Sequence, residues 1–103
     1  MGYPAKNHQR EPLRYSRPIS WDLFWHNEVG ELVFPASASG WTKAKEVLCP
    51  FHADKNPGTF NVNILSGSYK CWSCGANGTA AHYVHQVHGL PWREAYRYVE
   101  EHS

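Results

Sequence analysis

The 103-residue chain lacks several features that identify a protein class at once. It has only three cysteines, an odd number that argues against a framework of disulfide bonds and for a reducing compartment. Its formal net charge is only +1, so a nucleic-acid-binding surface would need a local cluster of basic residues. It has neither an apolar run long enough to span a membrane nor the apolar segment of a secretory signal. These absences predict one small cytoplasmic domain.

The cysteines that are present fall into two short loops. Cys49-Pro50-Phe51-His52 offers a thiol and an imidazole, and Cys71-Trp72-Ser73-Cys74 offers two more thiols. Three thiolates and one imidazole form a closed tetrahedral set that suits zinc, and a β-hairpin between the loops would bring them together. A buried free thiol beside an unrelated pair is the alternative, but this paired spacing is typical of zinc sites. The sequence therefore predicts one structural zinc ion, bound by Cys49, His52, Cys71 and Cys74.

Short strands are expected around these loops. Alternation of residue types predicts strands over residues 31–35, 41–48, 59–65 and 68–72, with a hairpin turn at Ser66-Gly67 and a tight turn between Gly75 and Gly78. In the third strand, Phe60 and Val62 would point one way, and Asn61 and Asn63 the other. The predicted fold class is α+β, a small antiparallel β-sheet zinc ribbon flanked by short helices.

The first part of the chain is expected to be an extended basic arm over residues 1–18, ahead of a zinc-ribbon domain over residues 19–103. Prolines interrupt any helix in the arm, and apolar periodicity is absent. The arm is either a solvated tail or a segment that contacts phosphates or a partner. Its basic residues are Lys6, Arg10, Arg14 and Arg17.

An aromatic helix is expected over residues 21–28, where the domain begins. Ser20 is a favourable N-cap, and Gly30 is suited to end the helix. Trp21, Phe24 and Trp25 recur at helical spacing and would form one apolar face. We expect these three side chains to face the core.

Two more helices are expected over residues 80–88 and from Pro91 to the end of the chain, the first with Thr79 as N-cap and Gly89 after its last turn. Three histidines lie three residues apart on the first of them, His82, His85 and His88. Such a stripe could bind metal or titrate as a cluster. We expect exposed or partly packed histidines instead, because the zinc site is already filled. If His52 were displaced, His82 would be the next candidate ligand.

The motifs taken in order resemble a known family. Cys49-Pro50-Phe51-His52 is followed by Lys55-Asn56-Pro57, then by Tyr69-Lys70-Cys71-Trp72-Ser73-Cys74-Gly75, and finally by Gly89-Leu90 before the last helix. This order resembles the N-terminal zinc-binding domain of bacterial DnaG-type DNA primases over about residues 30–103. The chain departs from the family pattern at His82, where an acidic residue is common.

The resemblance implies a three- to five-stranded antiparallel sheet and a role in recognising single-stranded DNA template, in a bacterial, plasmid or phage genome. A separate catalytic domain, which holds magnesium with acidic residues, would make the primer. Asp22, Asp54 and the scattered glutamates form no such motif, so this chain is not expected to be an enzyme by itself. It would be a stand-alone module or one end of a longer primase.

A DNA-binding surface is predicted from the strand faces and the resemblance together. By alternation alone the lysines could be ordinary solvated charges, but the resemblance favours DNA contact and supports Lys55 most directly. Lysines would attract the phosphate backbone, aromatic rings would stack on bases, and asparagines would read base edges. The candidates are Lys43, Lys45, Lys55, Asn61, Asn63, Tyr69, Lys70 and Trp72.

A second function remains open at this point. Zinc ribbons also serve as rigid docking surfaces, so the chain could bind a replicative helicase or a primase catalytic subunit without DNA affinity of its own. The arginines of the arm and the histidine face of the helix over residues 80–88 are the surfaces that would do so.

Overall fold

The computed structural model describes residues 14–51 and 57–103, so His52, Lys55 and the first thirteen residues lie outside it. In chain order its elements are α2 (Trp21–Val29), β1 (Trp41–Lys43), β2 (Phe60–Asn63), β3 (Tyr69–Cys71), β4 (Asn77–Gly78), α3 (Ala80–Val87) and α4 (Trp92–Glu101). None of these helices is long and apolar enough to cross a membrane. The α+β class predicted from the sequence is confirmed.

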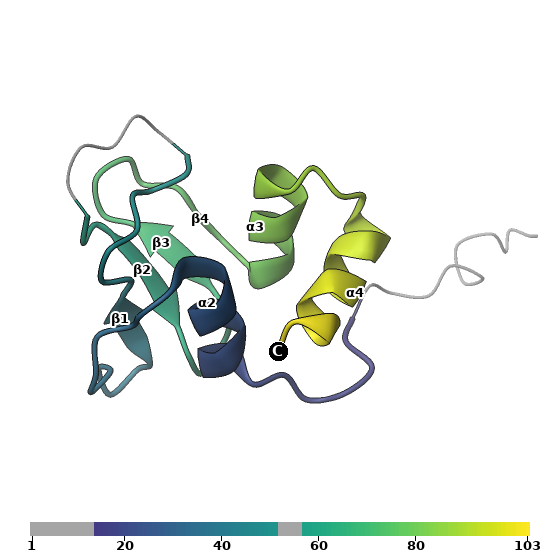
Figure 1. Ribbon diagram of the computed structural model, residues 1–103, viewed down its shortest axis with the longest axis horizontal. Helices are drawn as coiled ribbons and strands as arrows, with labels where there is room; N and C mark the ends of the chain where they lie inside the picture. Colours follow the sequence, from purple (N-terminus) through teal and green to yellow (C-terminus); the bar gives the residue numbers. More distant parts are fainter. Residues whose placement is uncertain (1–13, 52–56) are drawn as a thin grey trace, which may run out of the picture.

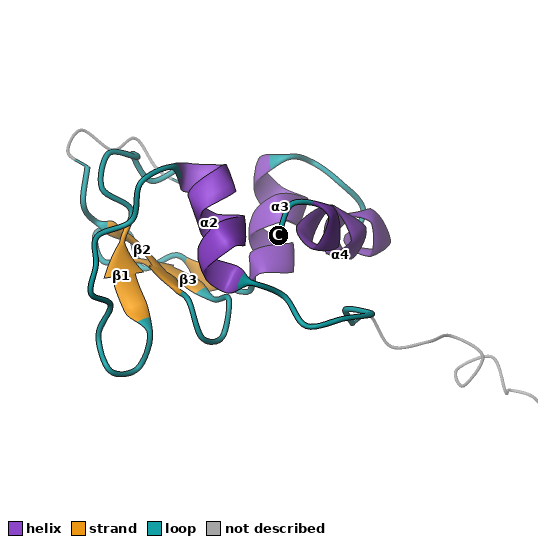
Figure 2. Ribbon diagram, turned by 60° about the horizontal axis from the view of Figure 1, so that its bottom comes forward, coloured by secondary structure: helices purple, strands orange, loops and turns teal. Residues whose placement is uncertain are grey.

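The four strands form one antiparallel sheet in the order β1-β2-β3-β4. Thr42 of β1 lies opposite Val62 of β2, and Asn61 of β2 lies opposite Lys70 of β3. Figures 1 and 2 show the sheet on one side of the molecule, the α3–α4 hairpin on the other, and α2 between them. The sheet therefore has one face turned toward helices and one face that no described helix covers, which we call the open face.

One of the predicted strands does not form, and another is shorter than predicted. No strand forms over residues 31–35, where Leu32 makes a single bridge to Ala44. Pro35 has no N–H group with which to continue a ladder. The strand predicted over residues 41–48 ends at Lys43, because the chain then leaves the sheet to reach the cysteines.

A fourth strand stands where the sequence suggests only a turn. Asn77 and Gly78 pair with Lys70 and Tyr69 and extend the sheet at its edge. Of the two glycines expected to flank that turn, only Gly75 has a positive φ, of 81°. The local sequence gives no strand signal here, because two residues are too few to show alternation.

The core is an aromatic cluster centred on Trp25 of α2. Trp25 and its neighbour Phe24 are fully buried, as predicted. The Trp25 ring makes edge contacts with Phe60, Tyr69 and Tyr83, at centroid separations of 6.4, 6.5 and 5.0 Å. Such edge-to-face pairs stabilise a core beyond the area that they bury. Trp25 thereby joins α2 to β2, β3 and α3.

The helix ends follow the predicted caps with one exception. The Thr79 hydroxyl accepts a hydrogen bond from the backbone N–H of His82 and so caps α3. Gly89 follows α3 with a φ of 70°, a conformation that favours glycine, and turns the chain toward α4. Ser20 occupies the N-cap position of α2, but its side chain makes no capping hydrogen bond.

A buried carboxylate joins the three helices. Glu28 of α2 accepts a 2.6 Å hydrogen bond from the Tyr98 hydroxyl of α4, and its other oxygen lies 2.9 Å from Nε2 of His88 at the end of α3. The Glu28 side chain is only 6% exposed, so these partners offset the cost of burying its charge. Burial, and then the bond to Glu28, raise the pKa of the Tyr98 hydroxyl to about 12.

The segment before α2 packs against α4. The Tyr15 ring lies 4.9 Å from that of Tyr96, and Ser16 and Arg17 hydrogen-bond to Glu100. These contacts lower the pKa of the Glu100 carboxyl, mainly through the two hydrogen bonds from Ser16. The described end of the arm predicted over residues 1–18 is therefore held to the domain.

Replacing Tyr98 with phenylalanine removes the hydroxyl that Glu28 accepts and leaves the buried carboxylate short of a donor. We expect Tyr98→Phe to lower the free energy of unfolding by about 1.5–3 kcal/mol, measured by urea denaturation. Tyr96→Phe is the matched control, because the Tyr96 hydroxyl has no hydrogen-bond partner among the described residues. Equal stability of the two variants would contradict the role given to Glu28.

Candidate metal centre and nucleic-acid interface

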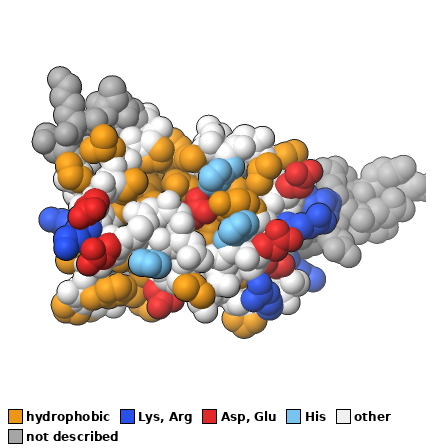
Figure 3. Space-filling model, viewed as in Figure 1, with side chains coloured by type: hydrophobic (Ala, Val, Ile, Leu, Met, Phe, Trp, Pro, Cys, Tyr) orange, Lys and Arg blue, Asp and Glu red, His pale blue; other side chains and the backbone are white. Residues whose placement is uncertain are grey.

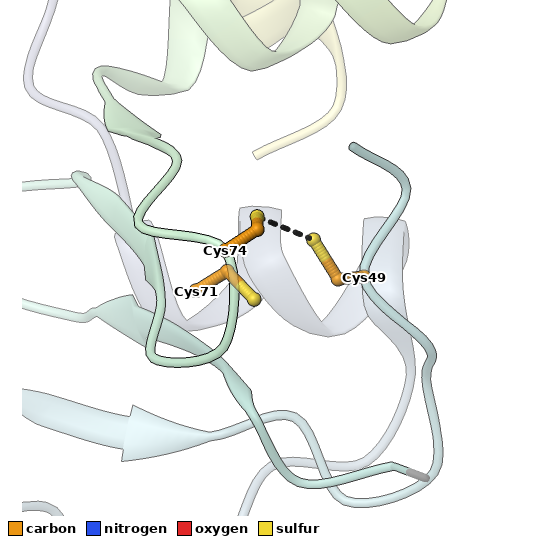
Figure 4. A group of neighbouring side chains, drawn as sticks. All are labelled: Cys49, Cys71 and Cys74. Carbon is orange, nitrogen blue, oxygen red and sulfur yellow. Dashed lines mark hydrogen bonds between the residues drawn. The ribbon is translucent and has the colours of Figure 1, made fainter. Parts of the chain in front are cut away.

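Three sulfur atoms come together beside the sheet. The Sγ atoms of Cys49, Cys71 and Cys74 all lie within 4.8 Å of one another, and those of Cys49 and Cys74 are 3.9 Å apart. Figure 4 shows two of these side chains on one turn and the third on the loop that faces it. The structure thus brings together three of the four residues that the sequence predicts as metal ligands.

The β3–β4 hairpin holds Cys71 and Cys74 in place. Cys71 ends β3, where its N–H donates to the carbonyl of Ala76 at 2.8 Å and its carbonyl accepts the N–H of Gly75 at 2.9 Å. These two bonds close a tight turn around Cys74. Two sulfur atoms are therefore positioned by the backbone of a single hairpin.

The opposite loop is anchored through its aromatic residue. Phe51 donates its backbone N–H to the sulfur of Cys49 at 3.4 Å. Its ring stacks on that of Tyr69, with the centroids 5.1 Å apart and the planes 8° from parallel. Since Tyr69 is only 1% exposed, this stack ties the Cys49 loop to the core.

The surroundings of Cys71 favour its thiolate. Burial by itself would raise the pKa of this thiol, but hydrogen bonds from the N–H groups of Cys74 and Ser73 and from the Thr59 hydroxyl outweigh burial and lower the pKa to about 7. Burial raises the pKa of Cys49, and the neighbouring Cys71 adds to the rise. Since metal ligands must be deprotonated, a cation among these thiols would offset both burial and mutual repulsion.

This donor set fits zinc. Zinc–sulfur bonds are about 2.3 Å long, which separates sulfur ligands by roughly 3.8 Å in a tetrahedron. The 3.9 Å between Cys49 and Cys74 is close to that spacing. His52, the predicted fourth ligand, lies outside the described residues. His82, the next candidate, instead has its Nδ1 2.6 Å from the Tyr69 hydroxyl.

His82 and His85 of α3 and His88 at its C-cap each have a different hydrogen-bond partner. His82 and His85 are half-buried, and His88 is exposed at one side. His85 Nδ1 lies 2.6 Å from the carbonyl oxygen of Leu90, and His88 bonds to Glu28. The expectation that these histidines are exposed or partly packed is confirmed.

A row of basic and amide residues crosses the open face of the sheet. Residues that lie opposite each other on antiparallel strands point to the same face. By this register, Lys43, Asn61, Lys70 and Asn77 follow one another across all four strands. Trp72 lies two residues beyond Lys70, so it continues the same face.

An exposed aromatic ring and a groove accompany this row. Trp72 is 62% exposed, and Nζ of Lys70 lies 4.1 Å from its ring centroid. A groove of about 500 Å³ adjoins the row at Lys70 and Asn77. It is lined by Trp41, Ser68, Tyr69, Lys70, Asn77, Gly78 and Thr79. Sequence reasoning missed most of these residues, because only the register of β1 and β4 places them together.

Three of the predicted DNA contacts are buried. Asn61 and Asn63 are 6% and 5% exposed, so the prediction that they lie on an exposed strand face is wrong. Asn61 Nδ2 donates to the carbonyl of Thr59, the residue just before β2, at 3.1 Å. Tyr69 is a core residue, so its ring is not available to stack on a base.

Asn63 has a structural role at the β2–β3 turn. Its Oδ1 accepts the backbone N–H groups of Leu65 and Ser66, both at 2.8 Å, and its Nδ2 donates to the carbonyl of Ser39 at 3.0 Å. The side chain thus satisfies two donors of the turn and one acceptor of a distant loop. This explains why a polar residue is buried here.

The remaining lysines differ in their surroundings. Lys43 is exposed at the end of β1, whereas Lys45 lies beyond the strand with its Nζ 3.7 Å from the carboxylate of Glu31. The strand predicted over residues 41–48 would place both on one strand face, and this prediction is wrong because β1 ends at Lys43. On the face that carries α2, Lys and Arg side chains lie toward the two ends, beside Asp and Glu (Figure 3). That face has no continuous basic patch.

Comparison with known proteins gives a consistent picture. A family model described as CHC2 zinc finger matches residues 40–103. The chain is 40% identical over 53 residues to a DNA primase of Neisseria meningitidis. This aligned region is 52% of this chain and 9% of that protein. It is 42% identical over 48 residues to a DNA primase of Campylobacter jejuni. That aligned region is 47% of this chain and 8% of the relative. The chain thus matches less than a tenth of the length of these relatives.

A solved structure has a similar fold. The Aquifex aeolicus primase, in a structure of its zinc-binding and RNA polymerase domains, superposes with a TM-score of 0.50 at 22% sequence identity. The superposition covers 82% of this chain and 21% of that one. At this identity the likeness is one of fold, and it includes most of the residues described above.

The bonds of Asn63 predict a stability effect separate from nucleic-acid binding. We expect Asn63→Ala to lower the free energy of unfolding by about 2–4 kcal/mol, because it leaves buried groups of the turn unsatisfied. Gln86→Ala, an amide exposed on α3, is the control and should change stability by less than about 0.5 kcal/mol. Urea denaturation measures both, and a neutral Asn63→Ala would show that the turn does not need this side chain.

Proposed function

Since the chain belongs to the CHC2 zinc finger family, the zinc-binding domain of DNA primases, we propose that it binds single-stranded template DNA across the open face of its sheet. The observation that carries this proposal is the row from Lys43 to Lys70, with an exposed tryptophan and a groove that both adjoin Lys70. Among the elements described, this is the one sheet face that the helices do not cover.

The chemistry of this face suits an unpaired strand. Lys43 and Lys70 would attract phosphates, and the exposed ring of Trp72 would stack on a base without regard to its identity. The polar wall of the groove, with Ser68 and Asn77, would accept the edge of a base or sugar. Lys55 remains a further contact expected from the family resemblance.

We further propose that one zinc ion is held by Cys49, His52, Cys71 and Cys74. When bound, zinc would crosslink the Cys49 loop to the β3–β4 hairpin, with all four positions taken by protein. Zinc binding by a small domain contributes directly to its folding free energy. The residues of the open face lie on the strands that this crosslink joins, so DNA binding would require the metal.

The match to a small part of each relative indicates how the domain would be used. The zinc-binding domain is the only part of those primases that this chain matches, so primer synthesis would need a catalytic domain, in the same chain or in a partner. We propose that the domain presents template to such a catalytic unit, with a replicative helicase as a further partner.

The zinc proposal predicts one zinc ion per chain and a specific role for His52. We expect His52→Ala to weaken zinc binding at least roughly tenfold and to change the visible spectrum of the cobalt-substituted protein. His26→Ala, on the exposed side of α2, should leave both unchanged. If His52→Ala binds cobalt with unaltered affinity and spectrum, the fourth ligand is another group.

The DNA proposal is tested by fluorescence anisotropy of zinc-loaded protein with single-stranded DNA at several salt concentrations. Lys43→Gln and Lys70→Gln should each weaken binding and reduce the salt slope by about 0.7. Lys45→Gln is the matched control, because Lys45 already pairs with Glu31. Zinc-loaded protein that binds no single strands even at low salt would contradict the proposal and leave a docking module for another replication protein.

A further inference from the structure

We infer that the nucleic-acid path continues beyond the sheet, along α3 to Trp92, and that the exposed face of this ring stacks on one base of the strand. The inference rests on the proposed binding of single-stranded DNA and assigns a second, helical part to the same interface. It is carried by contacts that join the groove to α4 and by the fixed geometry of the Trp92 ring.

The groove and α3 are continuous. Gly78 and Thr79 form the end of the groove, and Thr79 is the N-cap of α3. His82 lies so close to Gly78 that a Cβ added there would be 2.5 Å from its Nδ1. Thr79, His82 and His85 follow one another at a spacing of three, so they share one side of the helix. Tyr69 and Gly78, which His82 contacts, lie on the face opposite Lys70 and Asn77, so a nucleic-acid strand would pass round the edge strand β4 to meet these side chains next.

Trp92 is a prepared stacking surface at the end of this track. The rings of Trp92 and His85 lie face to face, with centroids 4.1 Å apart and planes 20° from parallel. His82 also lies parallel to it, at 5.9 Å. Trp92 is nevertheless 40% exposed. Because its inner face is already packed, holding this ring in place for a base costs little additional side-chain entropy.

The His85 ring is fixed in turn. Its Nδ1 lies 2.6 Å from the carbonyl oxygen of Leu90, which can only accept, so Nδ1 is the donor. This bond sets the orientation of the imidazole that supports Trp92. The orientation of the His85 and Trp92 rings is thus fixed by the α3–α4 connection as well as by their mutual stacking.

The charge next to Trp92 is favourable for a phosphate backbone. Arg93 and Arg97 are exposed, and neither forms a salt bridge with any carboxylate in residues 14–51 or 57–103. They lie four residues apart, on neighbouring turns of α4. These arginines lie on the same helix as the exposed indole, so α4 supplies both a cation and a stacking surface, as sites for single strands do.

The length of the track gives the inference a measurable form. The rise from Thr79 to His85 is about 9 Å, which corresponds to about two or three nucleotides of a stacked strand. The affinity should therefore increase when a strand that just fills the sheet face is lengthened by that amount. The increase should depend on Trp92, whereas binding of the shorter strand should not.

The experiment measures anisotropy with single-stranded oligonucleotides of increasing length on the full zinc-loaded chain. Trp92→Leu, which keeps an apolar side chain against α3, should lose the affinity gained by the longer strands, roughly fivefold or more. Trp92→Phe should retain part of it. Leu65→Ala, an exposed apolar residue at the β2–β3 turn, is the control and should bind as the unaltered protein does.

Photocrosslinking of the unaltered protein to strands that contain 5-iodouracil gives an independent test that needs no variant. A crosslink at Trp92 from the added nucleotides would support the path. Trp92→Leu with an unchanged length dependence, or crosslinks confined to the sheet, would overturn it while the proposed function stands. An absence of binding at every length would overturn the proposed function and this inference with it.

Discussion

The rest of the structure depends on one constraint, which is that Cys49 must reach the hairpin turn that carries Cys71 and Cys74. This requirement ends β1 after Lys43, since the chain must leave the sheet to cross toward the turn. It also explains the tight backbone bonding around Gly75. The strands are short because their ends serve the cluster. A zinc ion bound there, as proposed, would supply much of the stability of so small a domain.

The aromatic core joins the helices to the sheet, which the cysteine cluster does not do. Trp25 brings α2 over one face of the sheet, and Glu28 fastens the α3–α4 hairpin to α2. With that face covered, the alternation of the strands leaves Lys43 and Lys70 on the other. The division of the molecule into a helical side and an open side therefore follows from which strand residues are apolar. The binding face that we propose is a by-product of how the core is built.

Much of this architecture could be predicted from the sequence because its signals are local. The cysteine spacing, the Thr79 cap and Gly89 each specify a turn or a helix end. The family resemblance inferred from the motifs is confirmed by the family match over residues 40–103. The errors came from long-range effects. The burial of Asn63 depends on the carbonyl of Ser39, and the groove depends on strand register, neither of which a single segment encodes.

Tyr69 belongs to both halves of the molecule. Its ring stacks on Phe51 beside the cysteine cluster, and its hydroxyl meets His82 on α3. We therefore expect the cysteine loops and the helical hairpin to unfold together, because Tyr69 contacts both. A disturbance at the cysteines would be transmitted to the ring stack of Trp92 through two side chains. In so small a domain, loss of the proposed zinc ion would therefore alter the proposed binding surface as well as the loops that hold the ion.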